Sequence, residues 1–231
     1  MAQAIALHRY DDPAALAAAL AARVAGQLRA AIAARCAALL AVSGGSTPKH
    51  FFERLSHEAL DWGKVSVTLV DERWVPESSE RSNARLVRSL LLQHEAAAAT
   101  FVPLYVDAAT PEAGIAALRA RVATLPGSFD AVVLGMGGDG HTASFFPGGD
   151  RLAEALDRHG SARVLPMRAE GAGEPRITFT LPALLDSRLL VLHIEGEAKR
   201  AVLEQACEDG STLPIASVLR AVPGLETYWC P

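Results

Sequence analysis

The 231-residue chain has few cysteines and no excess of basic charge. Its three cysteines, Cys36, Cys207 and Cys230, lie far apart and lack the close spacing of metal ligands. We therefore expect neither a disulfide framework nor a metal site. The formal net charge of −4 gives no electrostatic reason to expect binding to nucleic acid or to an anionic membrane.

Long apolar runs and a targeting signal are also missing from the sequence. The N-terminal stretch MAQAIALHRYDDP has no basic region followed by an apolar core and a cleavage site. No apolar run approaches the ~20 residues needed to span a bilayer. We therefore expect a cytoplasmic protein. Half of the residues are hydrophobic and 21% are charged, which is the composition of an ordinary globular protein with a substantial core.

Strand and helix patterns alternate along the chain and predict an α/β fold. Leucines and other apolar residues recur every four positions from Pro13 to about Arg35, which predicts an amphipathic helix capped by Asp11 or Asp12. Further helices are expected from Pro48 onward and over residues 82–93, 111–123, 197–208 and 214–220. Strands are expected over 37–42, 64–70, 101–106, 129–134, 163–167, 176–181, 188–194 and 226–229. This alternation predicts one domain, residues 1–231, with a mostly parallel sheet covered on both faces.

Three loops at the carboxyl ends of expected strands, residues 43–48, 71–76 and 135–144, carry unusual chemistry, and ligands bind at such ends in parallel sheets. The first loop, SGGSTP, lies between a strand and a helix. Its glycines, hydroxyl groups and helix N-terminus together favour phosphate binding. It is not a Walker A loop, because no Gly-Lys-Ser/Thr closes it. The alternative is a plain turn in which Ser46 or Thr47 caps the helix.

The sequence GMGGDG at residues 135–140 matches the G-x-G-x-x-G pattern of dinucleotide-binding folds. We interpret this match as accidental. The chain breaks at Pro147-Gly148-Gly149 instead of continuing as a helix, and Asp157 falls in a helical pattern where a strand end is required. Asp139 would also place a negative charge beside the pyrophosphate.

A carboxylate and an imidazole, Asp139 and His141, lie two residues apart in this glycine-rich turn. The carboxylate can orient the imidazole ring and favour its protonated form, which is typical of an active site. A hydrogen-bonded structural histidine is the alternative. The other six histidines have no such setting and are interpreted as surface or packing residues: His8, His50, His57, His94, His159 and His193.

Charged residues elsewhere are weaker candidates. Asp71-Glu72-Arg73 follows a strand, and Arg176 opens another. Lys199 lies in the first turn of a helix, where a cation is disfavoured unless an anion binds nearby. Each of these could also be an ordinary solvated surface charge.

Taken together, five segments resemble the 6-phosphogluconolactonases in order and approximate spacing, over about residues 37–218. They are SGGSTP, DERWVP with SNARLVRSLLL, GMGGDGHTASFFPG, GEPRITFTLPALL and IEGEAKRAVLEQA. The resemblance implies a Rossmann-like three-layer α/β/α fold. It also implies hydrolysis of 6-phospho-D-glucono-1,5-lactone to 6-phosphogluconate, the second step of the oxidative pentose phosphate pathway. The expected partner is this small sugar-phosphate lactone, with no cofactor, and the protein is expected to be a monomer or homodimer.

The resemblance also implies roles for individual residues. It places the sugar phosphate on Gly44, Gly45, Ser46 and Thr47, with Arg176 and Lys199 as cationic partners; Ser43, Asp71 and Gly137 complete the substrate-binding set. His141 is the implied base, Asp139 supports it, and Arg73 lies near the reacting end or the phosphate.

Glucosamine-6-phosphate deaminases, which belong to the same superfamily, are the main alternative. They resemble DGHIAFNEP at the histidine turn, where a glutamate assists a ring-opening histidine, and tend to read DEY at the second loop. This chain reads DGHTASFFP and DER, with Phe146 in place of the glutamate. Both departures remove proton-transfer groups that a deaminase needs. A non-catalytic sugar-phosphate sensor is a further alternative.

Overall fold

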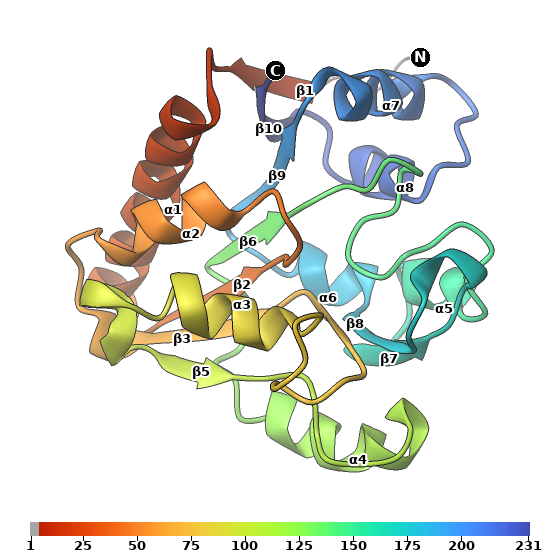
Figure 1. Cartoon of the computed structure of the whole chain (residues 1–231), viewed down its shortest axis with the longest axis horizontal. Helices are drawn as coiled ribbons and strands as arrows, with labels where there is room; N and C mark the ends of the chain where they lie inside the picture. Colours follow the sequence, from red (N-terminus) through yellow and green to blue (C-terminus); the bar gives the residue numbers. More distant parts are fainter. Residues whose placement is uncertain (1–4) are drawn as a thin grey trace.

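The computed structural model describes residues 5–231, and its centre is a seven-stranded sheet in which every pairing is parallel (Figure 1). The strand order is β1-β10-β9-β6-β2-β3-β5. The strands are β1 (Ile5–Arg9), β2 (Ala38–Val42), β3 (Val65–Leu69), β5 (Thr100–Val102), β6 (Ala131–Leu134), β9 (Leu190–Glu195) and β10 (Leu225–Cys230). The expected α/β fold with a mostly parallel sheet is therefore confirmed.

Helices lie on both sides of this sheet. In Figure 1, α1 (Pro13–Arg35) and α2 (Lys49–Ser56) lie on one side, and α6 (Leu181–Leu185) and α8 (Pro214–Ala221) lie on the other. The remaining α-helices are α3 (Asn83–Leu90), α4 (Pro111–Val122), α5 (Leu152–Leu156) and α7 (Glu197–Cys207). Buried hydrophobic residues from all these layers form one contiguous core.

Helix α1 shows how the sequence pattern becomes packing. Asp12 caps it, because its carboxylate accepts a hydrogen bond from the backbone N–H of Ala15 at 2.8 Å. Leu16, Leu20 and Leu28 are fully buried on the face that contacts the sheet. Among the described helices, α1 alone is long and apolar enough to cross a membrane by length and composition. The search for long uninterrupted apolar runs in the sequence did not find α1, because polar residues interrupt it. Its buried leucines lie on one face, as in a helix that packs against a protein core.

A second, three-stranded antiparallel sheet packs beside the first. It has the order β4-β8-β7 and consists of β4 (Asp71–Arg73), β7 (Val164–Met167) and β8 (Arg176–Phe179). The sequence placed residues 71–73 in a loop, which was wrong. It also did not separate the other two strands from the parallel sheet, because a fully buried strand has no alternating pattern to reveal its sheet. The antiparallel register places Arg73 opposite Arg176.

Some elements differ from the sequence-based expectations. Strand β1 and helix α6 were not predicted, whereas the helical pattern around Asp157 corresponds to α5, whose C-cap is that residue. Strand β5 ends before Pro103, which lacks the N–H that a ladder needs. In α3 the apolar residues Leu86 and Leu90 are only half-buried, whereas Asn83 is buried. The polar beginning of α3 turns inward, toward the site described below.

The order of the strands fixes where a ligand can bind. From β2 the chain moves outward to β3 and β5, then returns to the opposite side of β2 as β6 before continuing to β9 and β10. The loops that follow β2 and β6 therefore diverge from neighbouring strand ends and leave a crevice between them.

We expect opposite effects from two substitutions in α1. Leu20→Ala should lower the free energy of unfolding by about 2–5 kcal/mol, because Leu20 is fully buried. Gly26→Ala should raise it by roughly 0.5–1 kcal/mol, because Gly26 is exposed and a methyl group there would meet no atom within 4 Å. Urea unfolding measures both changes. Equal effects of the two variants would contradict the packing described for α1.

Candidate functional site

One pocket opens at the carboxyl ends of β2 and β6. It is lined by residues 43–48, by Asp71, Arg73 and Asn83, by residues 133–137, and by His141, Ala143, Arg176, His193 and Lys199. The structure thus brings together all the sequence-predicted site residues except Asp139, which contacts His141 from outside the pocket lining.

The loop of residues 43–47 leaves the beginning of α2 without a side-chain cap. Pro48 occupies the N-cap position and makes no side-chain hydrogen bond, so the alternative that Ser46 or Thr47 caps the helix is wrong. The loop is tied to the neighbouring turn, because the Ser43 hydroxyl accepts a hydrogen bond from the N–H of Gly135 at 2.9 Å. Backbone N–H groups at an uncapped helix start form a ready site for an anion.

Lys199 reaches this loop from α7. Its ammonium group donates a hydrogen bond to the hydroxyl of Thr47 at 2.8 Å. Burial lowers the pKa of Lys199, and the nearby carboxylate of Glu195 opposes that shift. A half-buried cation at the first turn of a helix, with a neutral hydroxyl as its hydrogen-bond acceptor, would be stabilised by a bound anion.

Arg176 lies in a buried ionic cluster at the base of the pocket. Its guanidinium group lies 3.8 Å from the carboxylate of Asp71 and donates a hydrogen bond to the carbonyl of Ala172 at 2.7 Å. Asp71 also accepts a hydrogen bond from the Ser144 hydroxyl at 2.6 Å. Burial lowers the pKa of Arg176, and the charge of Asp71 opposes this shift. Because Nε of Arg176 is buried without a partner among the described residues, the guanidinium retains unused donor capacity.

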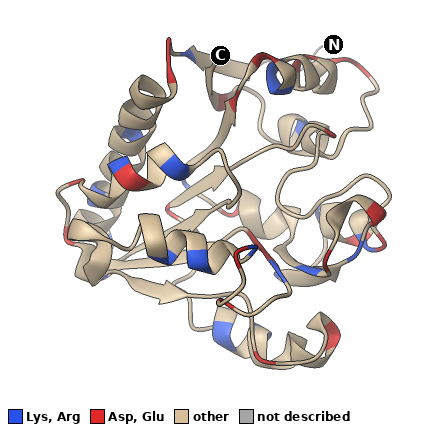
Figure 2. Cartoon of the chain, in the orientation of Figure 1, with Lys and Arg blue, Asp and Glu red and all other residues tan. Residues whose placement is uncertain are grey.

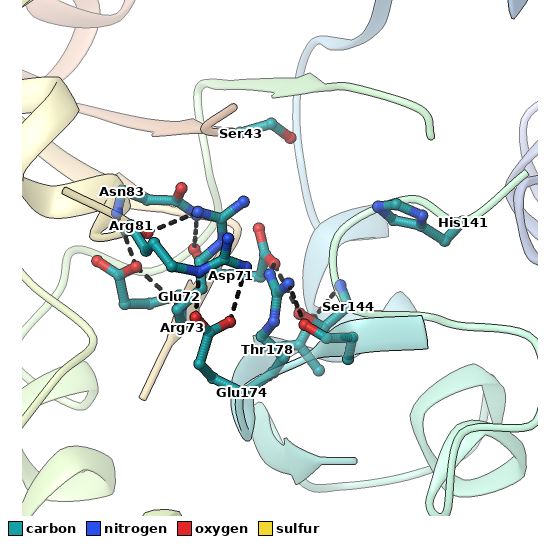
Figure 3. A network of polar contacts seen from close by, with 12 residues as sticks. Ser43, Asp71, Glu72, Arg73, Arg81, Asn83, His141, Ser144, Glu174 and Thr178 are labelled. Carbon is teal, nitrogen blue, oxygen red and sulfur yellow. Dashed lines mark hydrogen bonds and ion pairs between the residues drawn. The ribbon is translucent and has the colours of Figure 1, made fainter. Parts of the chain in front are cut away.

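Arg73 faces Arg176 across the β4–β8 pair and is held by a loop. Its Nη1 donates to the carbonyl of Arg81 at 2.5 Å, and the side chain of Arg81 forms an ion pair with Glu174 (Figure 3). Nε of Arg73 has no hydrogen-bond partner within residues 5–231. Arg73 therefore presents a positioned cation that can bind a charged or polarised oxygen.

The histidine turn holds an imidazole–carboxylate pair. Nδ1 of His141 lies 2.5 Å from a carboxylate oxygen of Asp139, which also accepts the His141 backbone N–H at 3.1 Å. Burial alone would raise the pKa of Asp139, but these contacts with His141 outweigh it and lower that pKa. With Nδ1 occupied by Asp139, Nε2 is the nitrogen available to accept a proton.

Two neighbours fix the position of the His141 ring. The ring of Phe146 packs against it with centroids 4.4 Å apart. The ring also lies close to Gly137, where a Cβ atom would be 2.2 Å from Cε1 of His141. Glycine at this position is therefore required for the close approach of the imidazole ring to the backbone.

Sequence reasoning missed two pocket residues. His193, interpreted as a surface or packing residue, is buried in β9, lines the pocket and contacts Glu195 through Nε2 at 3.1 Å. Asn83 opens α3 and is also buried. The only available signal for both was a polar residue inside or beside an apolar element, which is too common to single them out.

The described residues offer neither a cluster of metal ligands nor a helix directly after the glycine-rich turn. Within residues 5–231 no group of three or more His, Cys, Asp or Glu side chains is placed to hold a metal ion. The glycine-rich turn is followed by irregular chain, and the next helix, α5, begins only at Leu152. A dinucleotide fold instead requires a helix directly after its glycines.

Comparison with known proteins identifies relatives that span nearly the whole chain. The family model described as glucosamine-6-phosphate isomerases/6-phosphogluconolactonase matches residues 11–229. A 6-phosphogluconolactonase of Rhizobium meliloti is 57% identical, with 97% of this chain and 98% of that protein covered. One of Pseudomonas aeruginosa is 46% identical, with 92% and 89% covered.

Solved structures agree with this result. The crystal structure of a 6-phosphogluconolactonase from Shewanella baltica superimposes with a TM-score of 0.95 at 40% identity, and all of both chains is covered. A monomeric glucosamine-6-phosphate deaminase, at 18% identity and a TM-score of 0.78, covers 98% of this chain and 97% of its own and shares the fold. The chain belongs to the glucosamine-6-phosphate isomerase/6-phosphogluconolactonase family.

Proposed function

We propose that this protein is an enzyme that hydrolyses 6-phospho-D-glucono-1,5-lactone to 6-phosphogluconate with water activated by His141. The observation that carries the proposal is a pocket in which the loop before the uncapped start of α2 meets His141, whose imidazole is paired with Asp139. The relatives named 6-phosphogluconolactonase support the choice of substrate, because they are similar over nearly the full length of the chain.

The phosphate of the lactone binds to residues 44–47, which line the pocket and offer backbone N–H groups and hydroxyls, and Lys199 adds a positive charge. Arg176 lines the same pocket and adds a second cation. Because the phosphate is remote from the reacting carbonyl, its binding energy orients the lactone and does not itself break a bond.

Hydrolysis needs a water molecule, a base and a stabiliser for the oxyanion. Nε2 of His141 takes a proton from the water as the water oxygen attacks the C1 carbonyl. The resulting imidazolium is stabilised by Asp139, which lies 2.5 Å from Nδ1. His141 then returns the proton to the ring oxygen as the C1–O bond breaks, which opens the lactone and leaves the carboxylic acid.

Arg73 is the group best suited to face the developing oxyanion. Three of the backbone N–H groups in the glycine turn already have acceptors: those of Gly135, Gly137 and Gly140. The guanidinium of Arg73 has only the carbonyl of Arg81 as an acceptor among the described residues, so it has donors to spare.

A deaminase needs a proton-transfer group beside the histidine, and the structure places an apolar side chain there. The apolar ring of Phe146, and no carboxylate, packs against His141. Glucosamine 6-phosphate should therefore yield no ammonia, whereas a ring-opening deaminase would release it.

We further propose that the protein acts in the cytoplasm as a single domain, as a monomer or homodimer, without nucleic acid or membrane. Acidic and basic residues are interspersed in the view of Figure 2, with no continuous basic stripe there to follow a polyanion.

We expect His141→Ala to lower kcat by roughly 10²–10⁴-fold, because the variant has no general base. The rate of acid release from the lactone, corrected for spontaneous hydrolysis, measures the effect, and circular dichroism checks the fold. Wild-type activity in this variant would show that another group is the base.

A paired test concerns the glycines beside the base. Gly137→Ala should reduce kcat strongly, because the new Cβ would lie 2.2 Å from the His141 ring and displace it. Gly138→Ala is the matched control, because its Cβ would meet no atom within 4 Å and its φ is not positive. If both variants keep full activity, His141 does not need the position described here.

The phosphate site predicts a different kinetic signature. Lys199→Ala and Arg176→Lys should each raise KM roughly 10- to 100-fold with a smaller change in kcat. The first removes a charge-assisted contact to the phosphate, and the second keeps the charge but loses the planar guanidinium and its several donors. Lys49→Ala is the control, because Lys49 is exposed and lies outside the pocket. Unchanged KM values in both pocket variants would place the phosphate elsewhere.

A further inference from the structure

The two glycines of the 43–47 loop are required for different physical reasons. Gly45 has a φ of +95°, a conformation that L-residues rarely adopt, and a Cβ there would meet nothing within 4 Å. Gly44 has no positive φ, but a Cβ there would lie 2.1 Å from Oδ1 and 2.2 Å from Cγ of Asn83. The side chain of Asn83 therefore occupies the space that any larger residue at position 44 would need.

Asn83 is held firmly in that place. Its side chain is buried and its Nδ2 donates a hydrogen bond to the carbonyl of Asp71 at 3.0 Å (Figure 3). Its backbone N–H donates to Oε1 of Glu72 at 2.8 Å. The residue thus spans the distance from β4, which carries Asp71 and Arg73, to the backbone of the loop at Gly44.

Glu72 holds Asn83 and the first turn of α3 in place. It is fully buried, and its carboxylate accepts hydrogen bonds from the backbone N–H groups of Arg73, Asn83 and Ala84 and from the hydroxyl of Ser82. Burial raises the pKa of Glu72 to about 7, and the backbone donors oppose the shift. One carboxylate therefore joins β4 to the first turn of α3, so that Asn83 cannot move away from Gly44 independently.

We propose that Asn83 is a positioning residue for the phosphate end of the substrate, which acts by holding Gly44 and the following amide groups in their binding conformation. Asn83 has this role through its contact with Gly44 and its hydrogen bond to Asp71. Glu72 holds the backbone of Asn83 in place. The inference deepens the proposed function and rests on phosphate binding at residues 43–47.

The test is a double-mutant cycle in the full chain that adds a methyl group at position 44 and removes the side chain at position 83. Gly44→Ala alone should raise KM for the lactone, because its methyl group collides with Asn83. Asn83→Gly alone should raise KM with kcat within about twofold of wild type, because the loop loses its support. The double variant should have a lower KM than Gly44→Ala, with a coupling of roughly 2- to 150-fold, as for other residues in direct contact.

Gly45→Ala is the matched control for the cycle. Its defect comes from the positive φ, so Asn83→Gly should not relieve it. Multiplicative effects in the Gly44–Asn83 cycle, or equal relief of Gly44→Ala and Gly45→Ala, would overturn the proposal.

A second variant keeps the proposal testable if Gly44→Ala does not fold. Asn83→Asp preserves the shape of the side chain but cannot donate to the carbonyl of Asp71, so KM should rise while kcat changes little. An unchanged KM in both Asn83→Asp and Asn83→Gly would refute the positioning role.

Calorimetric binding of 6-phosphogluconate separates this inference from the proposed function, because it needs no turnover. If the wild-type protein binds this ligand but does not hydrolyse the lactone, the catalytic proposal fails. Weaker binding in Asn83→Gly then still supports the role of Asn83, and unchanged binding refutes it.

Discussion

The parallel pairing of β2 with β6 is the constraint on which the site depends. Val42 lies opposite Val133 in this pair, so the two strands end side by side and their loops begin at the same edge. The pairing continues past the strands, because the N–H of Ser43 donates to the carbonyl of Val133 and the Ser43 hydroxyl accepts the N–H of Gly135. The loop of residues 43–47 and the histidine turn are therefore fixed relative to each other before any substrate arrives. Such preorganisation is the main way in which a rigid α/β scaffold orients a small substrate.

The second sheet adds charge to this frame. Its antiparallel register sets Arg73 opposite Arg176, and two like charges at neighbouring positions of a strand pair repel each other. The carboxylates of Asp71 and Glu174 offset that repulsion. Burial and the charge of Arg73 lower the pKa of Arg176, whereas both carboxylates raise it. Lys199 lines the same pocket, so three basic side chains, Arg73, Arg176 and Lys199, surround the place where we propose that the phosphate binds. Under this proposal a bound anion would offset part of the free energy that burying these cations costs, so affinity would depend on the charge of the substrate.

The sequence predicted those elements whose pattern of apolar, polar and glycine residues lies within one continuous segment. These include α1, with its four-residue period, the glycine turns and the strands of the main sheet other than β1. The sequence also indicated the His141–Asp139 pair from its glycine-rich setting. The three-stranded sheet was not predicted, because the pairing of β4 with β8 joins segments about 100 residues apart through main-chain hydrogen bonds that leave no periodic trace. Asn83 was missed for the same reason: its importance comes from Gly44, which is close only in the folded chain.

The proposed function depends on the orientation of the substrate, which a crystal structure of the protein with 6-phosphogluconate would reveal. We expect the phosphate to lie on the amides of residues 44–47 near Lys199. We also expect an oxygen of the C1 carboxylate within hydrogen-bond distance of Nε2 of His141, roughly 2.6–3.2 Å. A ligand bound in the reverse direction, with its phosphate at His141, or bound outside this pocket, would refute this orientation.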